Sequence, residues 1–197
     1  MSKGEETRER IVDRAWRMAS RDGLSGLSIG RLASELGLSK SGLFAHFGSK
    51  EDLEVAVLKS AADRFTDEVI RPALQAPRGI ARLRKMFKNW MTWVNDPGQP
   101  GGCIFLAASA ELDDGSGPQR DFLVAAQSGL RAMLAKAARF AVEAGELRAD
   151  LDCEQFAFDM QGIIMAYQHS RRLLRDPKAE QHVRAAFERL LSTNGAG

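Results

Sequence analysis

The sequence predicts an all-α protein of about nine helices. Apolar residues recur at helical spacing along most of the 197 residues, and Ser, Asp, Gly and Pro stand where helices would begin and end. No stretch shows the alternation that predicts a strand. Hydrophobic residues make up 44% of the chain, which is enough to form a substantial core.

The first helix is expected from about Glu5 to Arg21, with residues 1–4 loose in front of it. One face of this helix is apolar: Ile11, Ala15, Met18 and Ala19. A turn over residues 22–26, which contains two glycines, separates it from the next helix.

Two short helices follow in quick succession. The apolar stripe of the first of them is Ile29, Leu32, Ala33 and Leu36. The Ser28 hydroxyl can accept a free N–H of its first turn, and Gly37 can end it in a left-handed conformation. Ser39 caps the second, on which Leu43 and Phe47 can face its neighbour. Two short helices joined by a tight turn form a helix-turn-helix, whose second helix enters a DNA major groove.

The outward side of the second helix is suited to a groove because its side chains are mostly short. It carries Lys40, Ser41, Gly42, Ala45 and His46. Lys40 can donate to a guanine edge or to a phosphate. Ser28 and the N–H groups behind it can hold another phosphate at a helix N-terminus. The alternative is a small helical subdomain in which the Ser and Gly residues serve only as caps and stops.

The run SKSGLFAHFGSKEDL, residues 39–53, resembles the signature of the TetR family of transcriptional regulators. The resemblance implies an N-terminal three-helix DNA-binding domain, residues 1–48. It also implies an effector-binding and dimerisation domain, residues 49–197, which begins with a linking helix over 49–71. The resemblance covers roughly residues 8 to 58.

Site residues follow from the resemblance by position. Lys40, Ser41 and Gly42 would lie against base edges and backbone. Position 44 and His46 would contact phosphates, and Lys50 would hold a phosphate at the next helix start. Position 44 is most often Tyr in the family, and Phe44 has no hydroxyl to donate.

The charge of the chain permits DNA binding without predicting it. The net charge is +2, and the first sixty residues hold ten basic and nine acidic side chains, a balance of +1. Between Arg21 and Lys50, four basic residues stand against two acidic ones, a local balance of +2. The motif therefore carries the prediction.

The composition also indicates a compartment. The polar start of the chain is unlike a secretory signal, and no apolar run approaches the roughly 20 residues that span a bilayer. The chain has only two cysteines, Cys103 and Cys153, and they lie far apart in the sequence. This is typical of reduced thiols. We expect a cytoplasmic protein that does not bind a membrane.

The C-terminal part is expected to hold the remaining helices. The linking helix should stop near Pro72, since the residue before a proline disfavours helical geometry. Further helices are expected over 80–94, 103–112, 118–144, 152–175 and 177–191. The tail, residues 192–197, has the composition of a disordered segment.

The helix expected over 152–175 is apolar on two sides, which predicts cover on both sides. We expect it to pair with the last helix and with their copies in a second chain, as a four-helix dimer interface. A twofold dimer would present two recognition helices to a palindromic site. The residues assigned to this interface are Gly162, Met165, Val183, Phe187 and Leu190.

The sequence predicts neither an enzyme nor a metal or cofactor site. The three histidines are scattered, neither cysteine has a second ligand at metal-binding spacing, and phosphate-binding Gly loops and nucleophile elbows are missing.

The sequence instead favours a pocket for a small apolar effector, because the C-terminal helices are rich in bulky, adaptable side chains. For any one of these residues, ordinary core packing is the default interpretation. The residues assigned to the pocket are Trp90, Trp93, Cys103, Phe105, Met133, Met160, Gln161 and Tyr167.

These features together predict a homodimeric repressor that binds a palindromic double-stranded DNA operator and responds to a ligand. One alternative is an activator, or a regulator that answers to a protein partner. Another is a helical enzyme or carrier that uses the same apolar pocket.

Overall fold

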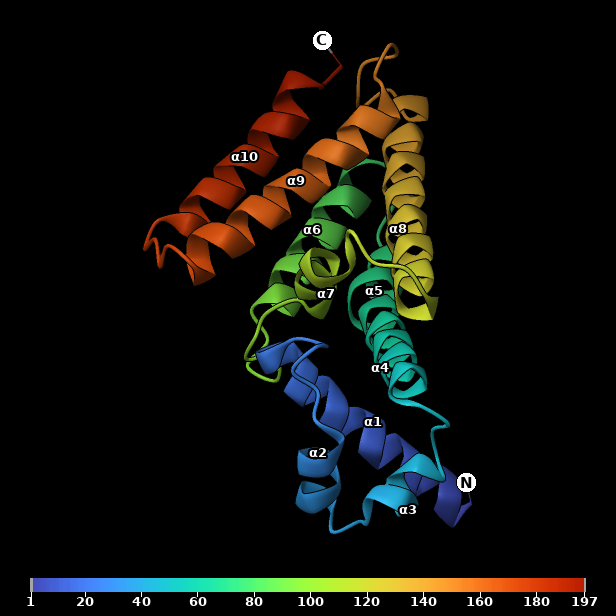
Figure 1. The fold of residues 1–197 in the computed structure, drawn as a ribbon. Coiled ribbons are helices and arrows are strands. Elements are labelled where there is room, and N and C mark those ends of the chain that lie inside the picture. Colours follow the sequence, from blue (N-terminus) through green and yellow to red (C-terminus); the bar gives the residue numbers. More distant parts are fainter. Residues whose placement is uncertain (1, 197) are drawn as a thin grey trace. The chain divides into compact units, whose positions relative to one another are not determined.

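The fold is all-α, as the sequence predicts. A computed structural model describes residues 2–196 (Figure 1), within which the only β-type pairing is an isolated bridge between Leu147 and Gly195. The helices are α1 (Lys3–Asp22), α2 (Ile29–Leu36), α3 (Lys40–Phe44), α4 (Lys50–Phe65), the π-helical turn η1 (Thr66–Ile70), α5 (Arg71–Leu74), α6 (Ile80–Val94), α7 (Ile104–Leu112), α8 (Pro118–Glu143), α9 (Cys153–Arg172) and α10 (Ala179–Thr193). Because α4, η1 and α5 follow one another without a break, the described residues form nine separate helices.

The chain forms two compact units. The first comprises Met1–Phe65 and Asn95–Ala126, and the second comprises Thr66–Val94 and Gln127–Gly197. These compact units are not the two domains predicted from the sequence, which divide the chain between residues 48 and 49 by DNA binding and effector binding. That functional division stays a prediction.

In the first unit, α1 packs against α4, and the short helices α2 and α3 close the other side (Figure 1). Its core combines Ile11, Leu32, Leu43 and Leu53, each almost fully buried. Phe65 at the end of α4 meets Phe105 of α7 edge to face, with ring centroids 6.2 Å apart.

In the second unit, α9 and α10 lie side by side as a helical hairpin (Figure 1). The ring of Phe87 on α6 stacks on that of Phe187 on α10, with centroids 4.0 Å apart and planes 4° from parallel. Arg171 of α9 donates to the carbonyl of Val94 at 3.5 Å, which joins α9 to the end of α6.

The expectation that the linking helix stops near Pro72 is wrong, since the helix continues to Leu74. A proline lacks an N–H and its ring crowds the carbonyl four residues earlier. The π-helical turn lies directly before Pro72 and changes the local hydrogen-bond pattern, and Pro72 falls in the first turn of α5, where its missing N–H costs little. The side chain of Asn89 on α6 donates to the carbonyl of Val69 at 3.0 Å, so this backbone acceptor is paired.

Both chain ends are more ordered than predicted. Ser2 and Glu5 form a capping box, so α1 begins at Lys3. Helix α10 extends to Thr193, and the Arg148 N–H donates to the carbonyl of Asn194 at 2.9 Å. Composition suggested a disordered tail, but backbone pairing with the segment before α9 orders the tail up to residue 196. Residues 1 and 197 lie outside the described part.

Among residues 2–196, no helix combines the length and the apolar character that a membrane-crossing segment needs.

Candidate nucleic-acid interface

Helices α2 and α3 begin at the serine caps that the sequence predicts, and α2 ends at Gly37 as predicted. Helix α3 ends at Phe44, earlier than the helix that was expected to carry both Leu43 and Phe47. The Ser28 hydroxyl accepts a hydrogen bond from the Arg31 N–H at 3.4 Å, and the Ser39 hydroxyl accepts one from the Gly42 N–H at 3.0 Å. Gly37 ends α2 with φ 67°, a left-handed conformation that glycine adopts without strain. Local hydrogen bonds therefore determine the turn between the two helices.

Helix α3 buries one side and exposes the other. Leu43 of α3 is buried, and so is Phe47, which follows the end of the helix; both were predicted to face inward. Lys40 and Ser41 are exposed, and Phe44 is 41% exposed, a large fraction for an aromatic residue. The exposed side of α3 therefore combines one apolar ring with two polar side chains. Such a combination can contact both phosphates and bases.

Lys40 lies across the start of α2. A Cβ placed on Gly30 would come within 3.1 Å of Lys40 Cε, so the lysine side chain occupies the space that a larger residue at position 30 would fill. This contact brings the ammonium group close to the first turn of α2, which Ser28 caps.

Lys50, at the first position of α4, is held by contacts within the unit. Its Nζ lies 3.4 Å from the carbonyl oxygen of Ser25 and 3.5 Å from Glu54 Oε1. The start of α4 is fixed by Ser49 and Asp52, because the Ser49 hydroxyl accepts from the Asp52 N–H at 3.0 Å. This arrangement orients Lys50 at the same helix start that the sequence assigns to a phosphate.

His46 borders a groove of about 1160 Å³ between α1 and α4. Arg8 lines the same groove and places its guanidinium 4.8 Å from the centre of the Phe47 ring. No local sequence pattern groups Arg8 with α3, because 38 intervening residues separate Arg8 from Phe47.

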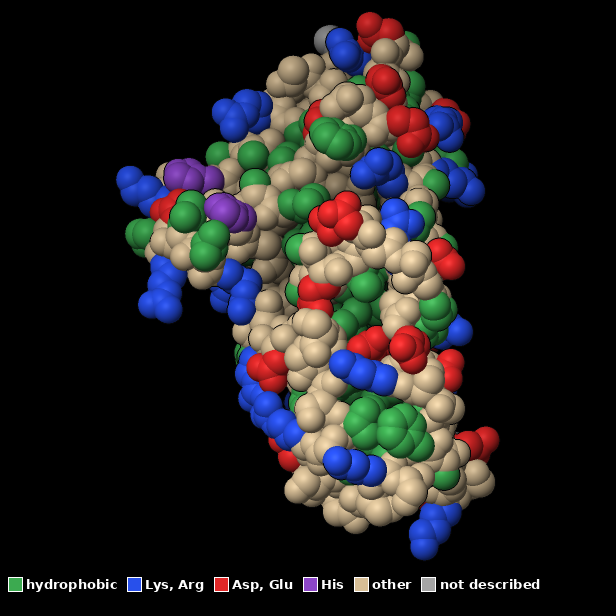
Figure 2. All heavy atoms as spheres, viewed as in Figure 1, with side chains coloured by type: hydrophobic (Ala, Val, Ile, Leu, Met, Phe, Trp, Pro, Cys, Tyr) green, Lys and Arg blue, Asp and Glu red, His purple; other side chains and the backbone are tan. Residues whose placement is uncertain are grey.

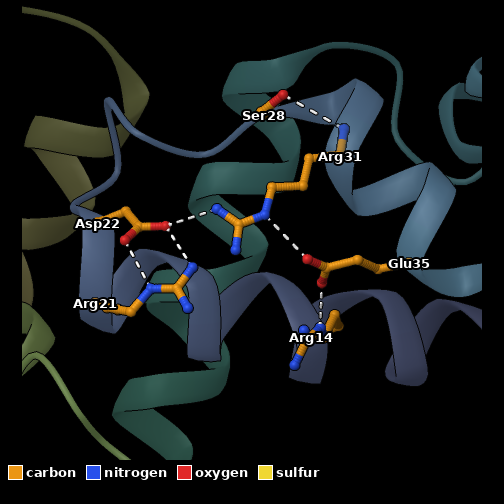
Figure 3. Close-up of polar contacts among 6 residues, drawn as sticks. All are labelled: Arg14, Arg21, Asp22, Ser28, Arg31 and Glu35. Atoms are coloured by element: carbon orange, nitrogen blue, oxygen red, sulfur yellow. Dashed lines mark hydrogen bonds and ion pairs between the residues drawn. The ribbon is translucent and has the colours of Figure 1, made fainter.

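A network of charged side chains fixes α2 to α1 (Figure 3). Arg31 of α2 donates to Glu35 at 3.0 Å and to Asp22 at 3.2 Å. Arg14 of α1 donates to Glu35 at 2.5 Å, and Arg21 binds Asp22 through two nitrogens, at 2.7 and 2.8 Å. Sequence reasoning missed Arg31, whose role depends on carboxylates from both helices.

This network lowers the pKa of both carboxyl groups. Hydrogen bonds from Arg14 and then Arg31 lower the pKa of Glu35, and the hydrogen bond from Arg21 is the main cause of the lowered pKa of Asp22. Both groups therefore remain charged at pH values where free carboxyl groups begin to protonate.

Acid is expected to weaken the attachment of α2 to α1. Because the folded pKa values lie below the unfolded ones, the network stabilises the fold above about pH 4 and loses this contribution as the pH falls through the folded values. Thermal unfolding followed by circular dichroism between about pH 7 and about pH 3 checks this. The midpoint of Glu35→Gln should fall less over this range than that of the wild type. Glu143→Gln, outside the network, should follow the wild type, and equal slopes for all three proteins would contradict the expectation.

The residues assigned to an effector pocket are mostly buried. Cys103 and Phe105 belong to the first unit, at the N-terminal end of α7. The second unit holds the others, all buried except the half-buried Met133: Trp90, Trp93, Met133, Met160, Gln161 and Tyr167. Gln161 accepts a hydrogen bond from Arg131 of α8 at 2.9 Å, a partner that the sequence did not suggest.

The residues assigned to a dimer interface separate into two groups. Gly162, Val183 and Leu190 line an open groove of about 840 Å³ between α9 and α10, and Met165 is 54% exposed on α9. Phe187 instead points inward and stacks on Phe87. Figure 2 shows hydrophobic side chains at the surface of this hairpin, between histidines and basic residues.

Within the described residues, no three His, Cys, Asp or Glu side chains come together as a metal-binding group.

Comparison with known proteins gives consistent matches along the chain. Residues 11–57 match the family described as bacterial regulatory proteins, tetR family, and residues 79–187 match the tetracyclin repressor-like C-terminal domain. The uncharacterized HTH-type transcriptional regulator YezE of Bacillus subtilis (strain 168) is 26% identical over 102 residues, which span 51% of this chain and about half (52%) of that relative.

Solved structures share the fold over nearly the whole length. A TetR transcriptional regulator from Chloroflexus aurantiacus J-10-FL is 25% identical, with a TM-score of 0.81 over 98% of this chain and 96% of the other. AibR, solved in complex with isovaleryl coenzyme A and operator DNA, is 22% identical, with a TM-score of 0.76 over 96% of this chain and 98% of the other.

Proposed function

Because the chain belongs to the TetR family of transcriptional regulators, we propose that it is a homodimeric repressor that binds a palindromic operator and releases it in response to a small apolar ligand. Residues 1–48 bind DNA, and residues 49–197 bind the effector and form the dimer. The chain acts in the cytoplasm and catalyses no reaction, in keeping with a family of regulators.

The orientation of α3 is the observation that carries the DNA-binding part of the proposal. Lys40 and Ser41 are exposed, and Leu43 is fully buried on the opposite side. The residues that can read base edges are therefore the ones available to a duplex. Gly42 lets α3 approach closely, and Phe44 makes van der Waals contact where a tyrosine would donate to a phosphate. His46, Lys50 and the capped N-terminus at Ser28 hold phosphates.

The groove between α9 and α10 supports the dimer. Phe158 and Met165 are 56% and 54% exposed, although both are large apolar side chains. A second copy of the hairpin would cover them. A twofold dimer places two recognition helices about 35 Å apart, one turn of DNA.

The buried side chains of the C-terminal part support a small apolar effector. Trp90, Met160 and Tyr167 are large or adaptable, and Gln161 adds a polar group that can orient a ligand. AibR, which shares this fold, was solved with both an acyl coenzyme A and operator DNA. An effector acts by binding more tightly to the conformation with low operator affinity.

Selection of bound sequences from random duplex DNA with the purified protein tests the proposal. An enriched palindrome with half-sites one helical turn apart is the expected result, and it supplies the probe for an effector screen. If a folded protein enriches no sequence at low salt, operator binding is rejected. A ligand that binds the protein but leaves operator affinity unchanged is not its effector.

A further inference from the structure

Glu111, near the end of α7, holds the turn between α1 and α2. Its carboxylate accepts a hydrogen bond from the Leu24 N–H at 3.1 Å and another from the Ser25 N–H at 2.7 Å. Two successive N–H groups that point the same way form a nest for an anion, and hydrogen bonds to a carboxylate are stronger than neutral ones. An acidic side chain far away in the sequence therefore fixes this turn.

The turn is shaped to receive this carboxylate. Gly23 adopts φ 81°, and a Cβ added there would collide with the Glu111 carboxylate. Leu24, whose N–H enters the nest, is itself buried, with 3% of its surface exposed. Glu111 thus binds a turn that the buried Leu24 side chain anchors to the core of the unit.

The other end of α7 is also joined to α1. The Ser20 hydroxyl, in the last turns of α1, donates to the carbonyl of Gly102 at 3.3 Å, and this contact is buried. A side chain at Gly101 would collide with the backbone of Ser20. These two glycines directly precede Cys103, the N-cap of α7. Both ends of α7 are therefore connected to the end of α1 and its turn.

The same turn contacts a candidate DNA-binding residue. The Ser25 carbonyl accepts from Lys50 Nζ at 3.4 Å, while the Ser25 N–H donates to Glu111. One residue of the turn thus contacts α7 through its N–H and the start of α4 through its carbonyl.

We infer that Glu111 is a positioning residue for operator binding, which couples α7 to the turn between α1 and α2 and, through Ser25, to Lys50. This inference rests on the proposed function. Cys103 and Phe105, which we assign to effector binding, lie at the opposite end of α7. A displacement of α7 reaches the turn through Glu111, within one compact unit. Coupling between two sites is reciprocal, so we expect operator binding to favour the position of α7 in which Glu111 holds the turn.

Hydrogen–deuterium exchange of residues 104–112 in the full-length chain, with and without the selected operator, tests this inference. In the wild type, we expect operator to slow exchange of these amides by roughly 5-fold or more. In Glu111→Gln, the amide can accept only one of the two hydrogen bonds, and we expect operator to slow exchange by less than about 2-fold. Circular dichroism verifies that each variant is folded at the measuring temperature.

Two further variants separate geometry from charge. Glu146→Gln is the matched control, because Glu146 accepts from the Ile80 N–H at 2.6 Å, lies against Gly79 in the same way, and belongs to the second unit. This variant also loses one negative charge, yet it should keep the wild-type slowing. Glu111→Asp keeps the charge but is one methylene shorter, and it should behave like Glu111→Gln.

The inference is overturned if Glu111→Gln retains the wild-type slowing, or if Glu146→Gln loses it equally. A wild-type protein that selects no operator overturns the proposed function and this inference together. If the wild type binds operator and operator slows exchange in Glu111→Gln as much as in the wild type, only the inference is overturned.

Discussion

Replacing Gly162 by leucine is expected to weaken the dimer between about 30-fold and about 10⁴-fold. Gly162 lines the groove between α9 and α10, and no atom of the surrounding chain lies within 4 Å of a Cβ built on it. Overpacking a close contact costs about 1–3 kcal/mol. A twofold interface repeats each contact, so the cost is incurred twice, and each 1.4 kcal/mol is about tenfold in affinity.

Gly129 provides the matched control for this variant. It lies within α8 in the second unit, and a Cβ built on it also has no neighbour within 4 Å. Leucine favours the helix over glycine by roughly 0.8 kcal/mol at either position, so neither fold should be destabilised. Only the groove position is expected to affect association.

Sedimentation equilibrium over a range of concentrations measures the effect. Gly162→Leu should be largely monomeric at concentrations where the wild type and Gly129→Leu are dimeric, and its operator affinity should fall because one half-site binds alone. A Gly162→Leu protein that dimerises like Gly129→Leu would place the interface elsewhere.

How much of the fold could be predicted from sequence depends on how far apart in the chain the interacting residues lie. Ser28, Gly37 and Ser39 act within three or four residues of their own helix ends, so their caps could be read directly and the structure contains them. These caps also fix which side of α3 is exposed. The all-α fold and the helix-turn-helix were predictable for this reason.

The failures involve partners distant in sequence. Pro72 was expected to end its helix, but a π-helical turn precedes it and the helix continues to Leu74. Asn89 of the next helix also binds the carbonyl of Val69 beside this turn. The tail pairs with residues 146–148, which its composition does not reveal. Periodicity placed Phe187 on the apolar face of its helix. It could not show whether this side chain lines the groove or packs inward, where it stacks on Phe87.

The candidate site divides in the same way. Lys40, Ser41 and His46 could be proposed from sequence because the motif is contiguous. Arg31 and Glu111 were missed because the first acts through carboxylates on two helices and the second binds a turn 87 residues earlier. A contiguous motif identifies residues that can touch DNA, whereas the residues that orient them depend on the fold.

Replacing Lys40 by alanine is expected to weaken operator binding by about 1–3 kcal/mol, roughly 5- to 150-fold. Alanine at the first position of α3 keeps the helix, since it has the best helix propensity, and Lys40 is exposed, so the fold should be unaffected. Fluorescence anisotropy with the selected operator and with a scrambled duplex measures the loss. Lys88→Ala on α6 removes the same charge from an exposed position and should bind like the wild type.

The pattern of the loss identifies what Lys40 contacts. If Lys40 donates to a base edge, the affinity ratio between operator and scrambled duplex falls, and substitutions at one base pair of each half-site become tolerated. If it donates only to a phosphate, both duplexes are weakened alike and the dependence of log affinity on log salt loses about one unit of slope per neutralised phosphate. Because its side chain lies across Gly30, Lys40 must leave the start of α2 to reach a base, so Gly30→Ala, which crowds Cε, should favour the DNA-facing position. An unchanged operator affinity in Lys40→Ala would exclude Lys40 as a contact and leave base recognition to Ser41.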